Sequence, residues 1–129
     1  RLGHLAVRLG IADRVDLPGF VANPFPFMAR CRVLALSSVR EGLGNVLVEA
    51  MALGTPVVAT ECTEGIRDLL RGGDLGGLVP VGDDEALARA LQVAIDSRPD
   101  LKALARATRP FGREAASRAY LDFFAGLLK

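Results

Sequence analysis

The sequence is poor in the residues that build metal centres and disulfide frameworks. Its 129 residues include two cysteines, one histidine and no tryptophan. Cys31 and Cys62 lack the additional cysteine or histidine ligands that a structural zinc site would need. We therefore interpret both as buried free thiols of a cytosolic protein. His4 falls on an expected helix near the start of the chain, and we interpret it as a surface residue.

The sequence also lacks any large excess of charge and any long hydrophobic run. Sixteen Lys and Arg residues nearly balance fifteen Asp and Glu residues, which leaves a net charge of +1. This balance gives no support for a nucleic-acid partner. No apolar stretch is long enough to span a bilayer, and the first residues show no signal-peptide pattern. Half the residues are hydrophobic, as in globular proteins, so we expect one domain in the cytoplasm.

What the sequence does have is a strong strand–loop–helix–strand pattern over residues 33–60. Residues 33–36 form a short apolar run that is typical of a strand, and a loop bounded by Gly42 and Gly44 follows. Apolar residues then recur at helical spacing over residues 45–53. Residues 57–59 predict the next buried strand. A βαβ unit of this kind indicates a parallel sheet.

The start of that expected helix has the features of an anion-binding site. Glycines let the backbone approach a ligand closely, and free N–H groups at a helix start favour an anion such as a phosphate. Glu41 lies just before the helix and Glu49 lies within it, with seven residues between the two acids. A carboxylate accepts hydrogen bonds well from sugar hydroxyls. One site could therefore hold a diphosphate on backbone amides and a sugar or ribose on each carboxylate.

The same residues resemble the donor-binding signature of retaining glycosyltransferases of family GT4, which have the GT-B fold. The pattern of that family is Glu, seven residues, Glu, and then Ala-x-Ala-x-Gly-x-Pro-Val-Val-Ala. The residues that fit it here are Glu41, Glu49, Ala50, Ala52, Gly54, Pro56, Val57, Val58 and Ala59. Two glutamates at this spacing carry no information alone, whereas the whole string in order is a specific match.

The resemblance implies an α/β fold, with a Rossmann-like, mostly parallel sheet and helices on both faces, as the C-terminal half of a GT-B enzyme. Residues 1–129 would then be a partial C-terminal nucleotide-sugar-binding domain. The acceptor domain and the first part of this domain, with its basic diphosphate clamp, would be absent. We therefore expect this fragment alone to be inactive.

The resemblance also implies a reaction and roles for individual residues. The full-length enzyme would transfer a sugar from a UDP- or GDP-linked donor to a glycan or lipid-linked acceptor with retention, in polysaccharide or glycolipid synthesis. Glu41 would be the catalytic residue, which holds the transferred sugar and stabilises its transition state, and Glu49 would bind the donor ribose. The donor-binding loop and helix start would comprise Gly42, Leu43, Gly44, Asn45 and Val46.

Further expectations concern the base, cofactors and partners. The loop of Gly19, Phe20 and Val21 matches the place where the family contacts the nucleotide base, and a plain turn is the alternative. The family uses no metal and no cofactor beyond the nucleotide-sugar substrate. The missing N-terminal domain would bind the acceptor. Peripheral association of the full-length protein with the inner face of a membrane is an alternative to a purely cytoplasmic location.

Two other functions stay open on the sequence. The chain could be a non-catalytic nucleotide-binding α/β domain, which titration with nucleotides and nucleotide-sugars would examine. It could also belong to another GT-B enzyme, such as a sugar-nucleotide epimerase, which would need catalytic groups of its own across the cleft.

The remaining elements follow from caps and apolar spacing. We expect a helix over residues 2–9, a short strand over 15–17, and a helix that Asn23 caps and Pro24 begins, with Phe27 and Met28 packed under the sheet. Residues 77–81 should form an edge strand. Aspartates should cap the two helices that follow, and these are Asp83 with Asp84 for the first and Asp100 for the second.

The C-terminal segment, Phe111 to Lys129, has the pattern of an amphipathic helix. Its apolar stripe could pack on its own sheet, on the missing domain or on a membrane surface, and the mixed charge of the polar face argues against the membrane. We expect part of this stripe to be uncovered.

Overall fold

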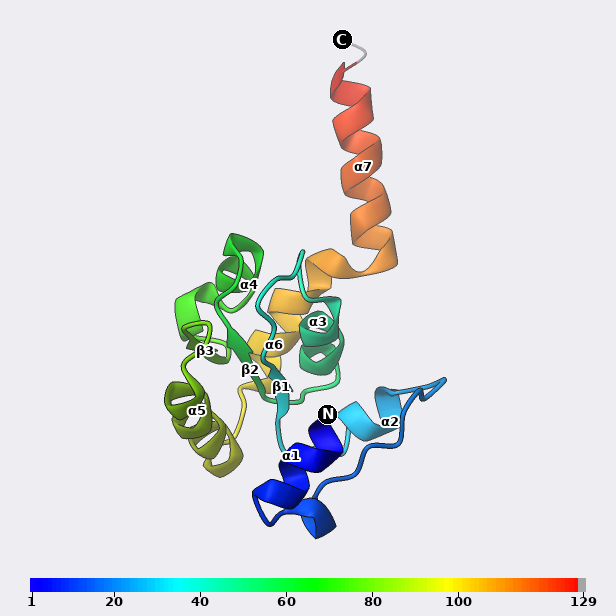
Figure 1. Ribbon diagram of the computed structural model, residues 1–129. Coiled ribbons are helices and arrows are strands. Elements are labelled where there is room, and N and C mark those ends of the chain that lie inside the picture. The colour runs from blue at the N-terminus through cyan, green and yellow to red at the C-terminus, as the bar shows by residue number, and fades with distance from the viewer. Residues whose placement is uncertain (128–129) are drawn as a thin grey trace.

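The computed structural model describes residues 1–127, and Figure 1 shows their arrangement. The elements in chain order are α1 (Leu2–Arg8), η1 (Ala12–Arg14), α2 (Phe25–Met28), β1 (Leu34–Leu36), α3 (Asn45–Ala52), β2 (Val57–Thr60), α4 (Glu64–Leu69), η2 (Arg71–Gly73), β3 (Gly77–Val79), α5 (Asp84–Asp96), α6 (Leu101–Thr108), η3 (Arg109–Phe111) and α7 (Arg113–Leu127).

The described strands form a parallel sheet in the order β1-β2-β3. Leu34 pairs with Val57 across the first ladder, and Val58 pairs with Gly77 across the second. The unit β1–α3–β2 confirms the βαβ pattern predicted over residues 33–60. All four residues of the central strand β2 are buried, as expected for a parallel strand that is covered on both sides.

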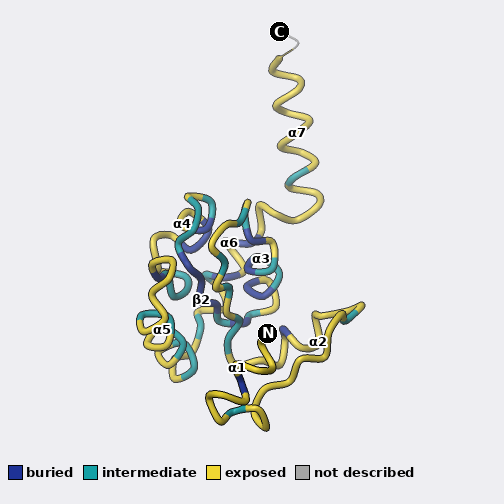
Figure 2. The backbone as a smooth tube through the Cα atoms, in the orientation of Figure 1, coloured by how far each residue is buried: buried dark blue, intermediate teal, exposed yellow. Residues whose placement is uncertain are grey.

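Helices cover both faces of the sheet. On one face, Val57 and Ala59 join a core made with residues of α3, α4 and α6, in which Leu47 and Ile66 are fully buried. On the other face, α5 packs against β2 and β3. A Cβ atom at Gly77 would lie 3.0 Å from Val58 and 3.2 Å from Ala90 of α5, so the absent side chain lets the helix approach the sheet closely. Figure 2 shows most of the buried residues gathered in this central body.

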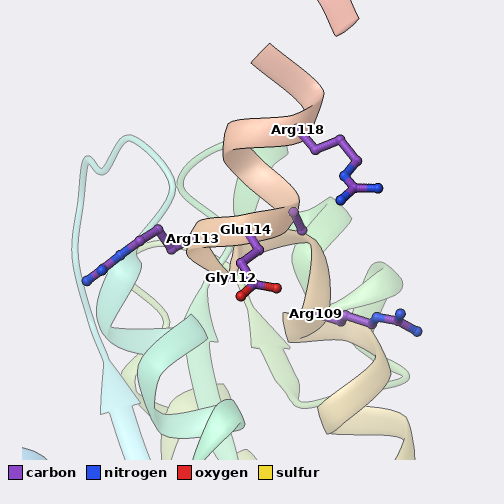
Figure 3. Close-up of a pocket in the computed structure, with 6 residues that line it drawn as sticks. Arg109, Gly112, Arg113, Glu114 and Arg118 are labelled. Atoms are coloured by element: carbon purple, nitrogen blue, oxygen red, sulfur yellow. The ribbon is translucent and has the colours of Figure 1, made fainter. Parts of the chain in front are cut away.

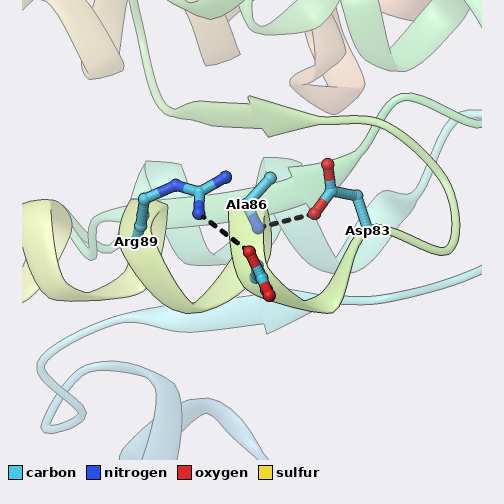
Figure 4. A network of polar contacts seen from close by, with 4 residues as sticks. Asp83, Ala86 and Arg89 are labelled. Atoms are coloured by element: carbon cyan, nitrogen blue, oxygen red, sulfur yellow. Dashed lines mark hydrogen bonds and ion pairs between the residues drawn. The ribbon is translucent and has the colours of Figure 1, made fainter.

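Aspartates begin the two helices after the sheet, as the sequence predicts. A carboxylate oxygen of Asp83 accepts a hydrogen bond of 2.8 Å from the backbone N–H of Ala86, and Figure 4 shows this cap at the start of α5. Asp100 accepts hydrogen bonds from the N–H groups of Lys102 and Ala103 at the start of α6. These bonds satisfy backbone donors that have no partner inside their own helix.

Two predictions about the first third of the chain need correction. Residues 15–17 form no strand, because no strand of the described sheet lies beside them. Only Met28 of the short helix α2 is buried, whereas Phe27 is exposed. The carbonyl oxygen of Met28 accepts a 2.7 Å hydrogen bond from the buried hydroxyl of Thr55, and this bond fixes which side of α2 faces the core.

Smaller corrections concern the start of α2, the end of β3 and a thiol. Pro24 is the N-cap of α2 rather than its first residue, although the side chain of Asn23 does accept a hydrogen bond from the N–H of Phe25. The edge strand β3 stops before Pro80, which has no N–H to continue the ladder. Cys62 is half-buried, but Cys31 is exposed because it follows α2 at the surface.

Helix α7 projects away from the central body, as Figure 1 shows. Its aromatic side chains are exposed, with 67% of Tyr120 and 54% of Phe124 accessible to solvent. The uncovered apolar stripe is therefore confirmed, and packing on its own sheet is excluded. The helix was predicted over residues 111–129, but Phe111 belongs to η3. Residues 128–129 lie outside the described range. Within residues 1–127, no helix has both the length and the apolar character to span a bilayer.

Candidate functional site

The loop between β1 and α3 leaves the sheet at the carboxyl end of β1. Gly44 is the N-cap of α3 and has a left-handed backbone, with φ of 72° and ψ of 59°. A Cβ atom at this position would lie 3.1 Å from Leu36 and 3.3 Å from Leu47. Both the left-handed conformation and the lack of space for a side chain therefore require glycine. Without a side chain at this position, the backbone of the loop packs directly against the core.

Among the residues that the structure describes, no side chain caps the leading end of α3. The N–H of Leu47 is bonded to the carbonyl oxygen of Gly44 at 2.8 Å. Within residues 1–127, the N–H groups of Asn45 and Val46 have no hydrogen-bond partner. An uncapped helix start leaves these donors and the positive end of the helix dipole available to an anion.

Glu41 lies in the loop just ahead of this helix end and is half-buried. Its carboxylate accepts a hydrogen bond of 2.7 Å from the hydroxyl of Ser38. The carbonyl oxygen of Ser38 in turn accepts a hydrogen bond from the hydroxyl of Thr60, the last residue of β2. The loop that carries Glu41 is thus attached to the carboxyl ends of two neighbouring strands.

Gly42 connects this loop to the one that follows β2. Its carbonyl oxygen accepts a hydrogen bond of 3.2 Å from the hydroxyl of Thr63, which also caps α4 by accepting from the N–H of Ile66. A Cβ atom at Gly65 would lie 3.5 Å from the carbonyl oxygen of Gly42 and 3.6 Å from Leu43. The two loops therefore meet at the edge of the sheet where parallel α/β proteins bind ligands.

Glu49 lies one helical turn beyond Asn45, so the two residues share one side of α3. The buried side of the helix consists of Leu47, Ala50 and Met51, and Glu49 is only half-buried. In the part of the chain that the structure describes, its carboxylate has no ion pair or side-chain hydrogen bond. The structure therefore places Glu41 ahead of the leading end of α3 and an unengaged Glu49 one turn behind it.

The predicted base-contact loop is not brought together with these residues. Gly19 has a φ of 75°, Phe20 is 95% exposed and Val21 is half-buried. Figure 1 shows their segment, between η1 and α2, on the opposite side of the molecule from the leading end of α3. A base contact from this loop stays a prediction.

A small pocket of about 380 Å³ adjoins the loop, where Leu43 and Gly65 form part of its wall. A larger hollow of about 590 Å³ lies elsewhere, at the junction of η3 and α7. Figure 3 shows that Arg113 points to one side of this junction while Arg109 and Arg118 point to the other. Side chains that diverge in this way do not form a common binding site, so the larger hollow is not the candidate site.

Three hydroxyl groups of the site were not predicted from the sequence, and they belong to Ser38, Thr60 and Thr63. Ser38 precedes Glu41 by only three residues, so their contact is local in the sequence, although no helix begins there. The other two act across the sheet, on residues more than twenty positions away. Such contacts depend on the strand register, which the sequence does not specify.

Comparison with known proteins shows the family to which the chain belongs. Residues 2–97 match the family described as "Glycosyl transferases group 1". The chain is 39% identical over 129 residues to the lipopolysaccharide core biosynthesis glycosyltransferase LpsE of Rhizobium meliloti. The alignment covers 96% of the chain and 38% of that protein.

A second relative and a solved structure agree with the first. The chain is 35% identical over 92 residues to the N-acetylgalactosamine-N,N'-diacetylbacillosaminyl-diphospho-undecaprenol 4-alpha-N-acetylgalactosaminyltransferase of Campylobacter jejuni, covering 71% of the chain and 25% of that protein. The structure of sucrose-phosphate synthase from Thermosynechococcus elongatus aligns with a TM-score of 0.83 at 28% identity, over 98% of the chain and 34% of that protein. The chain thus spans well under half of these relatives.

Proposed function

The chain belongs to the group 1 glycosyl transferases, and from this premise we propose that it is the donor-binding part of a retaining enzyme that uses a nucleotide-linked sugar. The observation that carries the proposal is the uncapped leading end of α3 between two glutamates. The amides of Asn45 and Val46 are unengaged within residues 1–127, and Glu41 is held just ahead of them.

The proposed roles follow from charge and position. The diphosphate of the donor takes the helix start, where the amides and the dipole stabilise negative charge that grows as the sugar–phosphate bond breaks. Glu41 accepts hydrogen bonds from the hydroxyls of the transferred sugar, and its negative charge stabilises the oxocarbenium-like transition state. Glu49 lies one turn along the same side of the helix, where it accepts from the ribose hydroxyls.

The acceptor and the pathway are proposed from the relatives. One is named for lipopolysaccharide core biosynthesis and another for transfer to a diphospho-undecaprenol-linked sugar. We therefore assign the parent enzyme to bacterial polysaccharide or glycolipid synthesis, with a glycan or lipid-linked acceptor. In this proposal a second domain, outside this chain, binds the acceptor, and the exposed apolar stripe of α7 packs against it.

Calorimetric titration of the chain tests the donor assignment. UDP, GDP, UDP-glucose and GDP-mannose are each added to the protein and to a Glu49→Ala variant. We expect one of the two nucleotide series to bind, and we expect the variant to bind that series about tenfold more weakly, as loss of a hydrogen bond to a charged group would produce. Binding of neither series, or equal binding by the variant, would overturn the proposal.

A further inference from the structure

The carboxylate of Glu41 is oriented by another side chain before any ligand arrives. The hydroxyl of Ser38 donates a 2.7 Å hydrogen bond to Oε1 of Glu41, and both residues are half-buried. Oxygen–oxygen distances of this length are typical of strong hydrogen bonds to ionised groups. With Oε1 engaged, rotation of the carboxylate is restricted, and its second oxygen remains available to a ligand.

Ser38 is itself held in place from the neighbouring strand. Thr60 is 5% exposed, and its hydroxyl donates to the carbonyl oxygen of Ser38 and lies 3.3 Å from that of Leu36. Leu36 and Thr60 are the last residues of β1 and β2. A buried hydroxyl thus fixes the backbone of Ser38 where the two strands end, and the side chain of Ser38 transmits this position to Glu41.

We propose that Ser38 is a positioning residue, which sets the orientation of the Glu41 carboxylate towards the hydroxyls of the donor sugar. This inference rests on the proposed function of Glu41. A carboxylate that is already oriented loses less rotational freedom when the ligand binds, so the contribution of Ser38 appears in binding of the sugar. Binding of the nucleoside diphosphate, which does not involve Glu41, is independent of Ser38.

The alternative role for Ser38 is purely local, as a hydrogen bond that keeps the loop folded. The two roles differ in what they do to ligand binding. Loss of loop structure lowers the affinity for the nucleoside diphosphate and for the nucleotide-sugar by the same factor, because both ligands contact residues 43–45 and these residues are displaced. Loss of carboxylate orientation weakens only the nucleotide-sugar. The ratio of the two dissociation constants therefore separates the roles.

The experiment titrates UDP, UDP-glucose, GDP and GDP-mannose into the chain and into three variants. In Ser38→Ala, we expect affinity for the nucleotide-sugar to fall about tenfold, with no change for the diphosphate. Ser38→Thr retains a hydroxyl at this position and should restore most of the affinity. Ser37→Ala is the matched control, because Ser37 is exposed and makes no side-chain hydrogen bond within the described residues.

Each outcome has a defined meaning. If Ser38→Ala lowers the affinities for the diphosphate and the nucleotide-sugar equally, or lowers neither affinity, the positioning role is overturned while the proposed function stands. If Ser37→Ala has the same selective effect as Ser38→Ala, the positioning role is likewise overturned. If the unmodified chain binds no nucleotide in either series, the proposed function fails, and the role of Ser38 fails with it.

Discussion

The hydroxyl of Thr63 lies 3.2 Å from the carbonyl oxygen of Gly42, twenty-one positions earlier in the chain. The same hydroxyl oxygen accepts the N–H of Ile66 and so caps α4. One side chain therefore joins the loop after β1 to the helix that follows β2. This contact keeps the glycine loop at the carboxyl edge of the sheet, where the candidate site lies.

Replacement of Thr63 by valine removes the hydroxyl but keeps the shape of the side chain. We expect Thr63→Val to lower the free energy of unfolding by about 1–2 kcal/mol, through loss of the helix cap and of the bond to Gly42. Urea denaturation followed by circular dichroism measures this change. Thr63→Ser keeps both hydrogen bonds and should retain most of the stability, and equal losses in the two variants would contradict the role of the hydroxyl.

Gly44 and Gly42 offer a matched pair of substitutions in the same loop. Alanine at Gly44 would have to adopt a φ of 72° and would meet Leu36 at 3.1 Å. We expect Gly44→Ala to destabilise the fold by about 1–3 kcal/mol, because L-residues are strained in the left-handed region. A Cβ atom at Gly42 meets nothing within 4 Å. Gly42→Ala should therefore leave the thermal midpoint nearly unchanged, and a similar drop in Tm for both variants would refute this reasoning.

Glu49 should matter for binding and hardly for stability, because it is half-buried and has no ion-pair partner within residues 1–127. We expect Glu49→Gln to change the free energy of unfolding by no more than about 0.5 kcal/mol. Its affinity for nucleotides that carry a ribose should fall several-fold. Glu85, an exposed glutamate paired with Arg89 on α5, supplies the control. An equal loss of affinity in Glu85→Gln would show that the effect is not specific to Glu49.

The sequence predicted the parallel βαβ unit and the start of α3 well, because local signals specify both. Alternation of apolar runs with helical spacing sets the elements, and Gly44 and Asn45 mark the helix start. Strand formation at residues 15–17 was predicted wrongly, since a strand needs a neighbour and no local pattern provides one. The hydrogen bonds of Thr60 and Thr63 were missed for a related reason, because they join segments that are brought together only by the sheet.

The C-terminal helix supplies a further pair of variants. The ring of Phe124 contacts Tyr120 and Phe123 on α7 but is 54% exposed, whereas Leu104 of α6 is 3% exposed in the main core. We expect Phe124→Ser to change the free energy of unfolding by no more than about 0.5 kcal/mol. Leu104→Ala should lower it by about 2–5 kcal/mol, the range for a buried leucine. A large loss in Phe124→Ser would mean that α7 packs on the body of the chain in solution.

The central claim is that the leading end of α3 binds the diphosphate of a nucleotide-sugar. The most direct measurement is a titration of the ¹⁵N-labelled chain with UDP-glucose and GDP-mannose, followed through the backbone amide resonances. We predict the largest shifts at Asn45 and Val46, with smaller shifts at Leu43 and Glu49. Saturable binding that leaves these amides unmoved, and instead shifts residues around Arg109 and Arg118, would contradict the claim.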